Sequence, residues 1–313
     1  MKNCRIKWLA AAACLSLLCG CAPQAPEAGE EEMDFSVDFA EAQTGEEKAS
    51  GGGPEAVAAR KAKKEPVILN FRDVFGKEYQ TPINEKIAAN PYQKERFRHD
   101  GDRLFYDDDS YDCMLGVDVS EHQGQIDWPR VKAQGYDFAI LRVGYRGYGA
   151  EGILKIDQEF DQNIRNAQAA GMKVGVYFFA QAINEQEAEE EANLVLQTIA
   201  PYSLELPVVY DPESILDDEA RTDHVSGEQF TRNTKVFCEK IREAGYEPMI
   251  YSNMLWEAFE LDLEKLSDYP IWYADYEPVP QTPYDFSFWQ YSNEGHVDGI
   301  AGNVDLDIWM RKR

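Results

Sequence analysis

The chain has 313 residues, 28% of them charged, and a formal net charge of −26 at pH 7. So acidic a balance makes nucleic acid an improbable partner, because its phosphates would be repelled. The four histidines are scattered without the spacing of metal ligands, so neither a metal site nor another cofactor is expected.

The first twenty residues have the pattern of a secretory signal. Lys2, Arg5 and Lys7 precede an apolar segment at 8–18 that is too short to span a bilayer. We therefore expect an exported protein from which residues 1–20 are removed. Loss of these three positive charges brings the mature chain to a net charge near −29.

Cys21 is the expected site of a lipid anchor. The sequence LCGC at 18–21 resembles the lipobox of bacterial lipoproteins, in which cleavage before a cysteine frees it for acylation. The anchor would hold the protein on the outer face of the bacterial cytoplasmic membrane. Cys14 is an alternative, but it lacks the expected branched apolar residue. Cys113 and Cys238 are then expected to be ordinary buried thiols, which are too few for a disulfide framework.

Two segments precede the main domain. Residues 21–65 are rich in Ala, Glu, Gly and Pro, which predicts a disordered acidic tether. Residues 66–112 hold short apolar runs around turn signals, which predicts a small β-rich N-terminal extension. Fewer than about fifty residues make a marginal core, so the extension is expected to pack against the main domain. The extension could have a structural role, or it could contact the cell wall or a partner.

Residues 113–313 alternate strand-like apolar runs with helical stretches. The predicted strands are 114–120, 138–145, 173–180, 206–213, 247–253, 270–276, 287–292 and 302–309. The predicted helices are 157–170, 185–199, 227–244 and 254–266. Eight strands with fewer than eight helices predict the α/β class, with an irregular (β/α) TIM-like barrel.

The run at 206–214 ends in two carboxylates, Asp211 and Glu213. Pro207 and Pro212 would break a helix, so a buried strand fits better. If the extended geometry persists through Pro212, the two carboxylates point to the same side. Close carboxylates titrate at different pH, which suits acid/base chemistry on a glycosidic bond. The alternative is a simple turn that contains a helix cap.

Chemistry in such barrels collects where the C-terminal ends of the strands meet. Asp118 and Asp305 are expected to join Asp211 and Glu213 there. Aromatic side chains can stack on sugar rings, and amides can bond hydroxyl groups. The candidate substrate-binding residues are Tyr177, Asn253, Tyr273, Asp275, Trp289 and Gln290, whereas Trp272 is assigned to the core.

Motifs along the main domain resemble those of the glycoside hydrolase family 25 lysozymes. These enzymes cleave the β-1,4 bond between N-acetylmuramic acid and N-acetylglucosamine in peptidoglycan. The motifs are GVDVSEHQG at 116–124, IDW at 126–128, RVG at 142–144, GVYFF at 175–179, PVVYDPE at 207–213, IWYA at 271–274, WQYS at 289–292 and NVD at 303–305.

The resemblance implies a role for each acid. Glu213 would be the proton donor to the leaving sugar, Asp211 its acidic neighbour, and Asp118 and Asp305 the rest of the acidic group. It also implies retention of configuration, either by attack of a carboxylate or with assistance from the N-acetyl group of the substrate. Pro212 departs from the aromatic or aliphatic residue usual between the two acids.

The resemblance implies peptidoglycan glycan strands as the partner. No cofactor and a monomer are also expected. A barrel that binds glycan without cleaving it is the alternative function. A metal-dependent sugar deacetylase would need clustered His and Asp ligands, which the scattered histidines do not supply.

Overall fold

The structure is a computed structural model that describes residues 65–216 and 218–313. The expected signal, the expected lipid-anchor residue Cys21 and nearly all of the predicted tether lie outside the described residues. Residues 66–313 form one unit. Within the described ranges, no helix is both long enough and apolar enough to cross a membrane.

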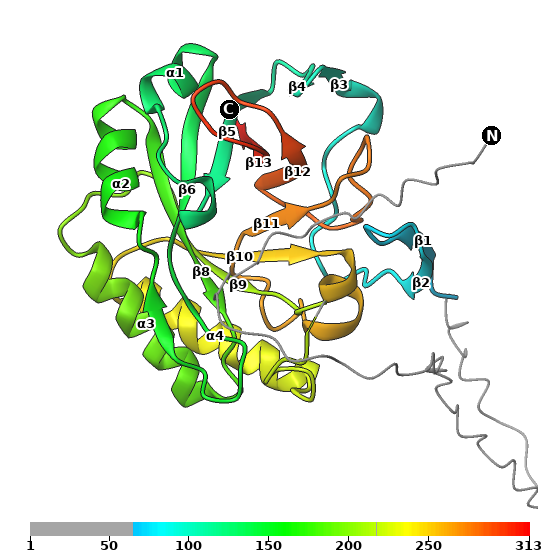
Figure 1. The fold of residues 1–313 in the computed structure, drawn as a ribbon. Coiled ribbons are helices and arrows are strands. Elements are labelled where there is room, and N and C mark those ends of the chain that lie inside the picture. Colours follow the sequence, from blue (N-terminus) through cyan, green and yellow to red (C-terminus); the bar gives the residue numbers. More distant parts are fainter. Residues whose placement is uncertain (1–64, 217) are drawn as a thin grey trace, which may run out of the picture. The chain divides into compact units, whose positions relative to one another are not determined.

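Eight strands close into a barrel (Figure 1). Around the ring their order is β5, β13, β12, β11, β10, β9, β8 and β6, and β6 pairs again with β5. The strands are β5 (Tyr111–Val119), β6 (Tyr136–Arg146), β8 (Lys173–Ala180), β9 (Val208–Pro212), β10 (Pro248–Asn253), β11 (Ile271–Ala274), β12 (Phe288–Gly295) and β13 (Val304–Lys312). The short β7 (Leu154–Ile156) pairs with β6 outside the ring. The predicted eight-stranded barrel is confirmed.

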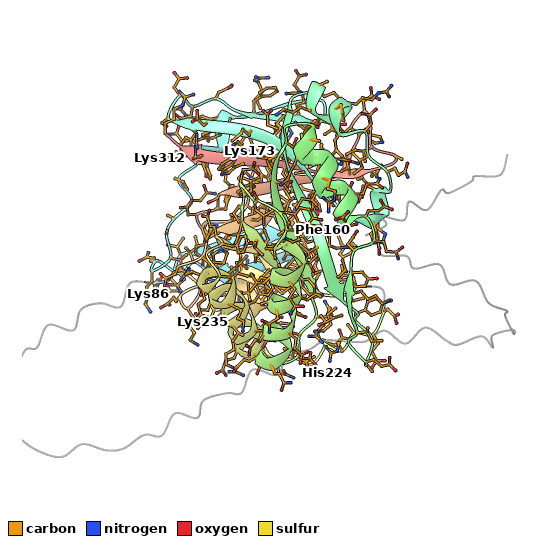
Figure 2. The ribbon with its side chains drawn as sticks, turned by 90° about the vertical axis from the view of Figure 1, so that its left-hand side faces the viewer. Lys86, Phe160, Lys173, His224, Lys235 and Lys312 are labelled. Atoms are coloured by element: carbon orange, nitrogen blue, oxygen red, sulfur yellow. The ribbon has the colours of Figure 1, made fainter. Side chains whose placement is uncertain are left out.

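The last strand runs against its neighbours. β13 is antiparallel to both β12 and β5, whereas the other pairs in the ring are parallel. Figure 2 accordingly shows Lys173, which starts β8, and Lys312, which ends β13, toward the same end of the barrel. The start of β13 therefore lies at the opposite end, where the parallel strands finish. We call that end the mouth.

The described residues form four α-helices, fewer than the strands. They are α1 (Trp128–Ala133), α2 (Phe160–Ala169), α3 (Glu185–Ile199) and α4 (Gly227–Glu243). Figure 2 looks at the side of the barrel that carries α2, α3 and α4, with Phe160 and Lys235 labelled. Short 3-10 turns occur at η1 (Lys94–Arg96) and η2 (Glu121–Gln123).

The predicted helix at 254–266 is wrong. The segment holds only a short helical turn that continues as a π-helix, η3 (Trp256–Glu260), followed by turns. Its beginning is fixed by Asn253, whose Oδ1 accepts hydrogen bonds from the N–H groups of Leu255 and Trp256. At Leu261 the backbone is extended, which ends the helical segment.

The barrel interior is filled by one apolar cluster, made of Phe138, Ile140, Leu206, Val209, Met249, Tyr251, Trp272, Ala274 and Phe288. Gly116 permits this packing, because a Cβ there would lie 2.3 Å from the ring of Phe138. Such an overlap is far inside van der Waals contact. A larger cluster fills the space between the outer face of the sheet and the elements that cover it.

The N-terminal extension consists of two small hairpins that pack against the barrel. β1 (Ile68–Arg72) pairs with β2 (Glu78–Pro82), and β3 (Phe97–Asp100) pairs with β4 (Arg103–Tyr106). The Tyr92 hydroxyl donates to the carbonyl of Phe286 at 2.8 Å, and the Asn90 amide donates to that of Thr282 at 3.0 Å. The expected boundary at residue 112 falls inside β5, which begins at Tyr111.

The two described cysteines are both free thiols. Cys238 is buried, as expected, but Cys113 is exposed, so the expectation of a buried thiol is wrong there. Cys113 lies near the start of β5, where the first four residues of the strand are half-buried or exposed, whereas the last five are buried.

Candidate active site

β9 delivers two carboxyl groups to the mouth. Its residues 208–210 pair with both β8 and β10, whereas Asp211 and Pro212 pair only with β8. Pro212 therefore sits where pairing is one-sided, and a strand tolerates its missing N–H there. Because the strand continues through Pro212, Asp211 and Glu213 lie close enough to interact electrostatically. The strand interpretation of this stretch is confirmed, and the turn alternative is not.

Three further carboxyl groups come from β5 and β13. Asp305 and Asp118 are register partners on the two antiparallel strands. The charge of Asp307 raises the pKa of Asp118, and the charge of Asp118 raises the pKa of Asp305, so the three side chains lie close together. We call Asp118, Asp211, Glu213, Asp305 and Asp307 the mouth cluster.

Burial and mutual repulsion hold these acids toward their protonated forms. Burial raises the pKa of Asp118 well above its usual range, and the negative charge of Asp307 adds to this. Burial likewise raises the pKa of Asp211, with the charges of Glu213 and Asp118 acting in the same direction. Asp307 is fully buried, and burial raises its pKa to about 8. The five acids therefore do not all ionise at neutral pH.

Glu213 is less buried than Asp211, the other acid that β9 delivers. It is half-buried, and burial raises its pKa to about 7, although the nearby Tyr251 hydroxyl lowers it. Gln181 Nε2 donates to the Glu213 carbonyl at 2.7 Å, and Thr222 Oγ1 donates to Gln181 Oε1 at 2.8 Å. The backbone that presents Glu213 is thus fixed from the end of β8. An acid with this pKa can donate a proton near neutral pH.

Gln290 orients Asp118. Its Nε2 donates to Asp118 Oδ2 at 2.8 Å, and its Oε1 accepts hydrogen bonds from the hydroxyls of Tyr251 and Tyr276, both at 2.9 Å. Gln290 is 4% exposed. Both ends of its amide are engaged, so the structure gives Gln290 a positioning contact where a sugar contact was expected.

Tyr177 and Asn253 differ in their relation to the acids. Tyr177 is half-buried, and its phenol interacts electrostatically with Arg142, Asp118 and Asp211. The structure therefore brings Tyr177 to the mouth cluster. Asn253 ends β10, but its side-chain oxygen caps the helical turn that comes next in the chain.

Tyr273, Asp275 and Trp289 are not brought to the mouth cluster. Tyr273 and Trp289 are both 0% exposed, within the cluster outside the sheet. Trp289 Nε1 donates to the Asp275 carbonyl at 2.7 Å, and the Tyr273 hydroxyl donates to Asp275 Oδ2 at 2.8 Å. Alternate residues of a strand point to opposite faces, so their neighbours Trp272 and Gln290 point inward instead. We expected these three residues to contact sugar, but in the structure their side chains make packing and loop contacts instead.

Asp307 is a site residue that the sequence analysis missed. Its Oδ1 accepts a hydrogen bond from Trp272 Nε1 at 2.8 Å, while its Oδ2 is buried without a hydrogen-bond partner in the described structure. The sequence held a signal, because Asp307 lies two residues after Asp305 and so faces the same side of a strand.

Arg142 also lies near the mouth cluster, although the sequence analysis named it only within the motif at 142–144. This buried side chain on β6 donates through Nε to Asp157 Oδ2 at 2.8 Å and pairs with Glu121 at 3.2 Å. Its charge lowers the pKa of Asp211, against the larger effect of burial. A single arginine inside the apolar run at 138–145 was the available signal. Among the described residues, no group of three or more His, Cys, Asp or Glu side chains could hold a metal ion.

Comparison with known proteins gives a consistent result. The model of the glycosyl hydrolases family 25 matches residues 117–300, which is more than half of the chain. The chain is 28% identical to the autolytic lysozyme of Clostridium acetobutylicum over 196 residues, which are 62% of this chain and 55% of that protein. It is 29% identical to lysozyme M1 of Streptomyces globisporus over 202 residues, covering 61% of this chain and 66% of that protein.

A solved structure has the same fold. The bacterial lysozyme of Streptomyces coelicolor superposes with a TM-score of 0.51 and 25% identity, covering 62% of this chain and 90% of that chain. The chain thus spans little more than half of the autolytic lysozyme but nearly all of this solved lysozyme.

Proposed function

This chain belongs to the glycosyl hydrolases family 25, and from this premise we propose that it cleaves the β-1,4 bond between N-acetylmuramic acid and N-acetylglucosamine in peptidoglycan. The observation that carries the proposal is the mouth cluster, in which the half-buried Glu213 has a pKa of about 7 beside four other acids. The lysozymes that the chain resembles support this choice of substrate.

Glu213 is the proposed general acid. It gives its proton to the oxygen of the leaving sugar as the glycosidic bond breaks, which leaves a developing positive charge on the other sugar ring. The pKa of about 7 supports this role, because the acid is substantially protonated near neutral pH and still able to release its proton.

The other acids of the mouth cluster are proposed to stabilise that positive charge. Those that are ionised repel one another in a buried site, and a cation held among them relieves the repulsion. Asp211 Oδ1 is buried without a hydrogen-bond partner among the described residues, so it is available to accept an N–H or O–H of the substrate.

The test is mass spectrometry of digested peptidoglycan. The wild-type protein is expected to release fragments with new reducing muramic acid ends, and Glu213→Gln to release at least about 100-fold fewer. Glu257→Gln is the matched control, because Glu257 is also buried, with a pKa raised to about 8, but bonds to Thr282 away from the mouth cluster.

Two outcomes would contradict the proposal. A fully active Glu213→Gln protein would remove Glu213 as the acid. Glycan binding by the wild type without any product would instead support the non-catalytic barrel that the sequence left as an alternative.

The location of the protein is a separate proposal, supported by the sequence alone. A lipid on Cys21 would hold the enzyme at the outer face of the cytoplasmic membrane, near its substrate. Replacement of Cys21 by Ser should move the protein from the membrane fraction into the medium. A monomer is also proposed, and sedimentation of the purified domain checks it.

A further inference from the structure

A surface pocket of about 470 Å³ lies beside the mouth. Its walls come from the tip of the β3–β4 hairpin, with His99 and Asp102, and from the barrel, with Tyr276 and Ser292. The volume is within the range of small-molecule sites. The hairpin precedes the family match, which begins at residue 117, so one wall of this pocket lies outside the matched region and the barrel wall lies within it.

Several hydrogen bonds fix the hairpin at this place. His99 Nε2 donates to the Pro278 carbonyl at 2.8 Å, and the Tyr291 hydroxyl donates to the Asp102 carbonyl at 2.9 Å. The His296 N–H donates to Asp102 Oδ2 at 3.0 Å. Both walls are therefore tied together, and the pocket exists before any ligand arrives.

Tyr276 connects the pocket to the mouth cluster. Its side chain is 36% exposed and lines the pocket, while its hydroxyl donates to Gln290 Oε1. Gln290 in turn holds Asp118. Tyr276 therefore lies between the pocket and the mouth cluster. A polymer that occupies the mouth and continues over the Tyr276 ring reaches the pocket.

We propose that this pocket binds a sugar residue of the glycan strand beyond the bond that is cleaved. The proposal rests on the proposed function, because it assumes that a glycan strand occupies the mouth. The exposed ring of Tyr276 offers a stacking face for a pyranose. The Asp102 carboxylate and the Ser292 hydroxyl accept hydrogen bonds from sugar hydroxyls.

The charge of the pocket favours a sugar over the peptide stems of peptidoglycan. The lining residues include one carboxylate, Asp102, and neither lysine nor arginine. The carboxylates of a peptide would find no cation among these residues. His99 bonds a carbonyl through Nε2, so this nitrogen carries the hydrogen, and a neutral ring leaves Nδ1 as a further acceptor for a hydroxyl.

The test compares the double variant His99→Ala, Asp102→Asn with the wild type on glycan strands whose peptides have been removed. Asn at position 102 keeps an acceptor for the His296 N–H. The matched control is Arg98→Ala, because Arg98 neighbours His99 on β3 and packs over the Phe105 ring. We expect KM on long strands to rise about tenfold for the double variant, with kcat/KM on the shortest cleaved oligosaccharide unchanged. Arg98→Ala should match the wild type on both substrates.

Three results would overturn the inference. They are an unchanged KM on long strands, an equal loss on long and short substrates, or a loss seen only when the peptide stems are present. Titration of long, peptide-free strands into each variant in the Glu213→Gln background gives a second readout, in which the double variant should bind about tenfold more weakly. If no variant cleaves, the proposed function fails, but this titration still decides whether the pocket binds sugar.

Discussion

Two groups of buried carboxyls near the ends of the barrel strands differ in what surrounds them. The mouth cluster consists of five acids. The second group, which we call the paired cluster, combines Glu187 and Glu191 of α3 with Arg146 and Arg221. Arg146 Nε donates to Glu191 Oε1 at 2.8 Å, and Arg221 Nη1 donates to Glu187 Oε2 at 2.6 Å.

The comparison shows that a raised pKa alone does not identify a catalytic acid. Burial raises the pKa of Glu191 to about 7, as it does that of Glu213, although the charge of Arg146 opposes it. Glu191 is 0% exposed and bonded to Arg146, so no substrate reaches it. Glu213 is half-buried at the mouth, beside Asp211. Glu213 therefore differs from Glu191 in two ways. Substrate can reach Glu213, and no arginine among the described residues is bonded to it.

Removing a cation from the paired cluster should produce the largest change in stability. Arg146→Met leaves Glu191 buried without its partner, and the free energy of unfolding should fall by about 3–5 kcal/mol. Urea unfolding measures this loss. The control is Arg165→Met, which breaks the exposed pair with Asp161 and should cost less than about 1 kcal/mol. Equal losses in the two variants would show that the paired cluster is not a structural element.

Much of the barrel was predictable from the sequence because each of its strands is a short apolar run. The direction of β13 was not predictable from such a run, because pairing direction depends on the connections and not on the residues of one strand. Asp307 was missed for the same reason, because it reaches the mouth cluster only if β13 starts at the mouth. Trp289 and Tyr273 were misplaced because aromatic residues near strand ends suit either face of a sheet.

Neutralising one acid of the mouth cluster should have the opposite effect on stability. In the folded protein Asp307 holds its proton up to about pH 8, whereas in the unfolded chain it releases it near pH 4. Its contribution to stability is therefore complete below about pH 4 and is lost progressively as the pH rises toward 8. Asp307→Asn does not titrate and keeps an acceptor for Trp272.

The stability of Asp307→Asn relative to the wild type should therefore grow by on the order of 1 kcal/mol per pH unit between about pH 5 and pH 7.5. Urea unfolding of both proteins across this range measures the difference. Asp161→Asn, which removes an exposed carboxyl with a lowered pKa, is the control and should show no such growth. A difference that stays constant with pH would contradict the buried, protonated state of Asp307.

The smallest changes should distinguish two neighbours of Glu213. The charge of Glu213 raises the pKa of Asp211, whereas the pKa of Glu213 itself is raised by burial, so Asp211→Asn should leave the pKa of Glu213 unchanged. Tyr251→Phe removes a hydroxyl that lowers the pKa of Glu213, so the proton should be held to higher pH. The alkaline limb of the pH–rate profile should therefore shift upward by up to roughly one pH unit in Tyr251→Phe and stay in place in Asp211→Asn. A downward shift in Tyr251→Phe would contradict the assignment of that limb to Glu213.

The pH dependence of kcat/KM for the wild-type protein tests most directly whether Glu213 in the mouth cluster is the general acid. Peptide-free glycan strands as substrate report the protonation state of the free enzyme. Because Glu213 must carry its proton to act and its pKa is about 7, kcat/KM should fall about tenfold per pH unit above that value. A rate that stays constant or rises between about pH 7 and pH 9 would contradict the account.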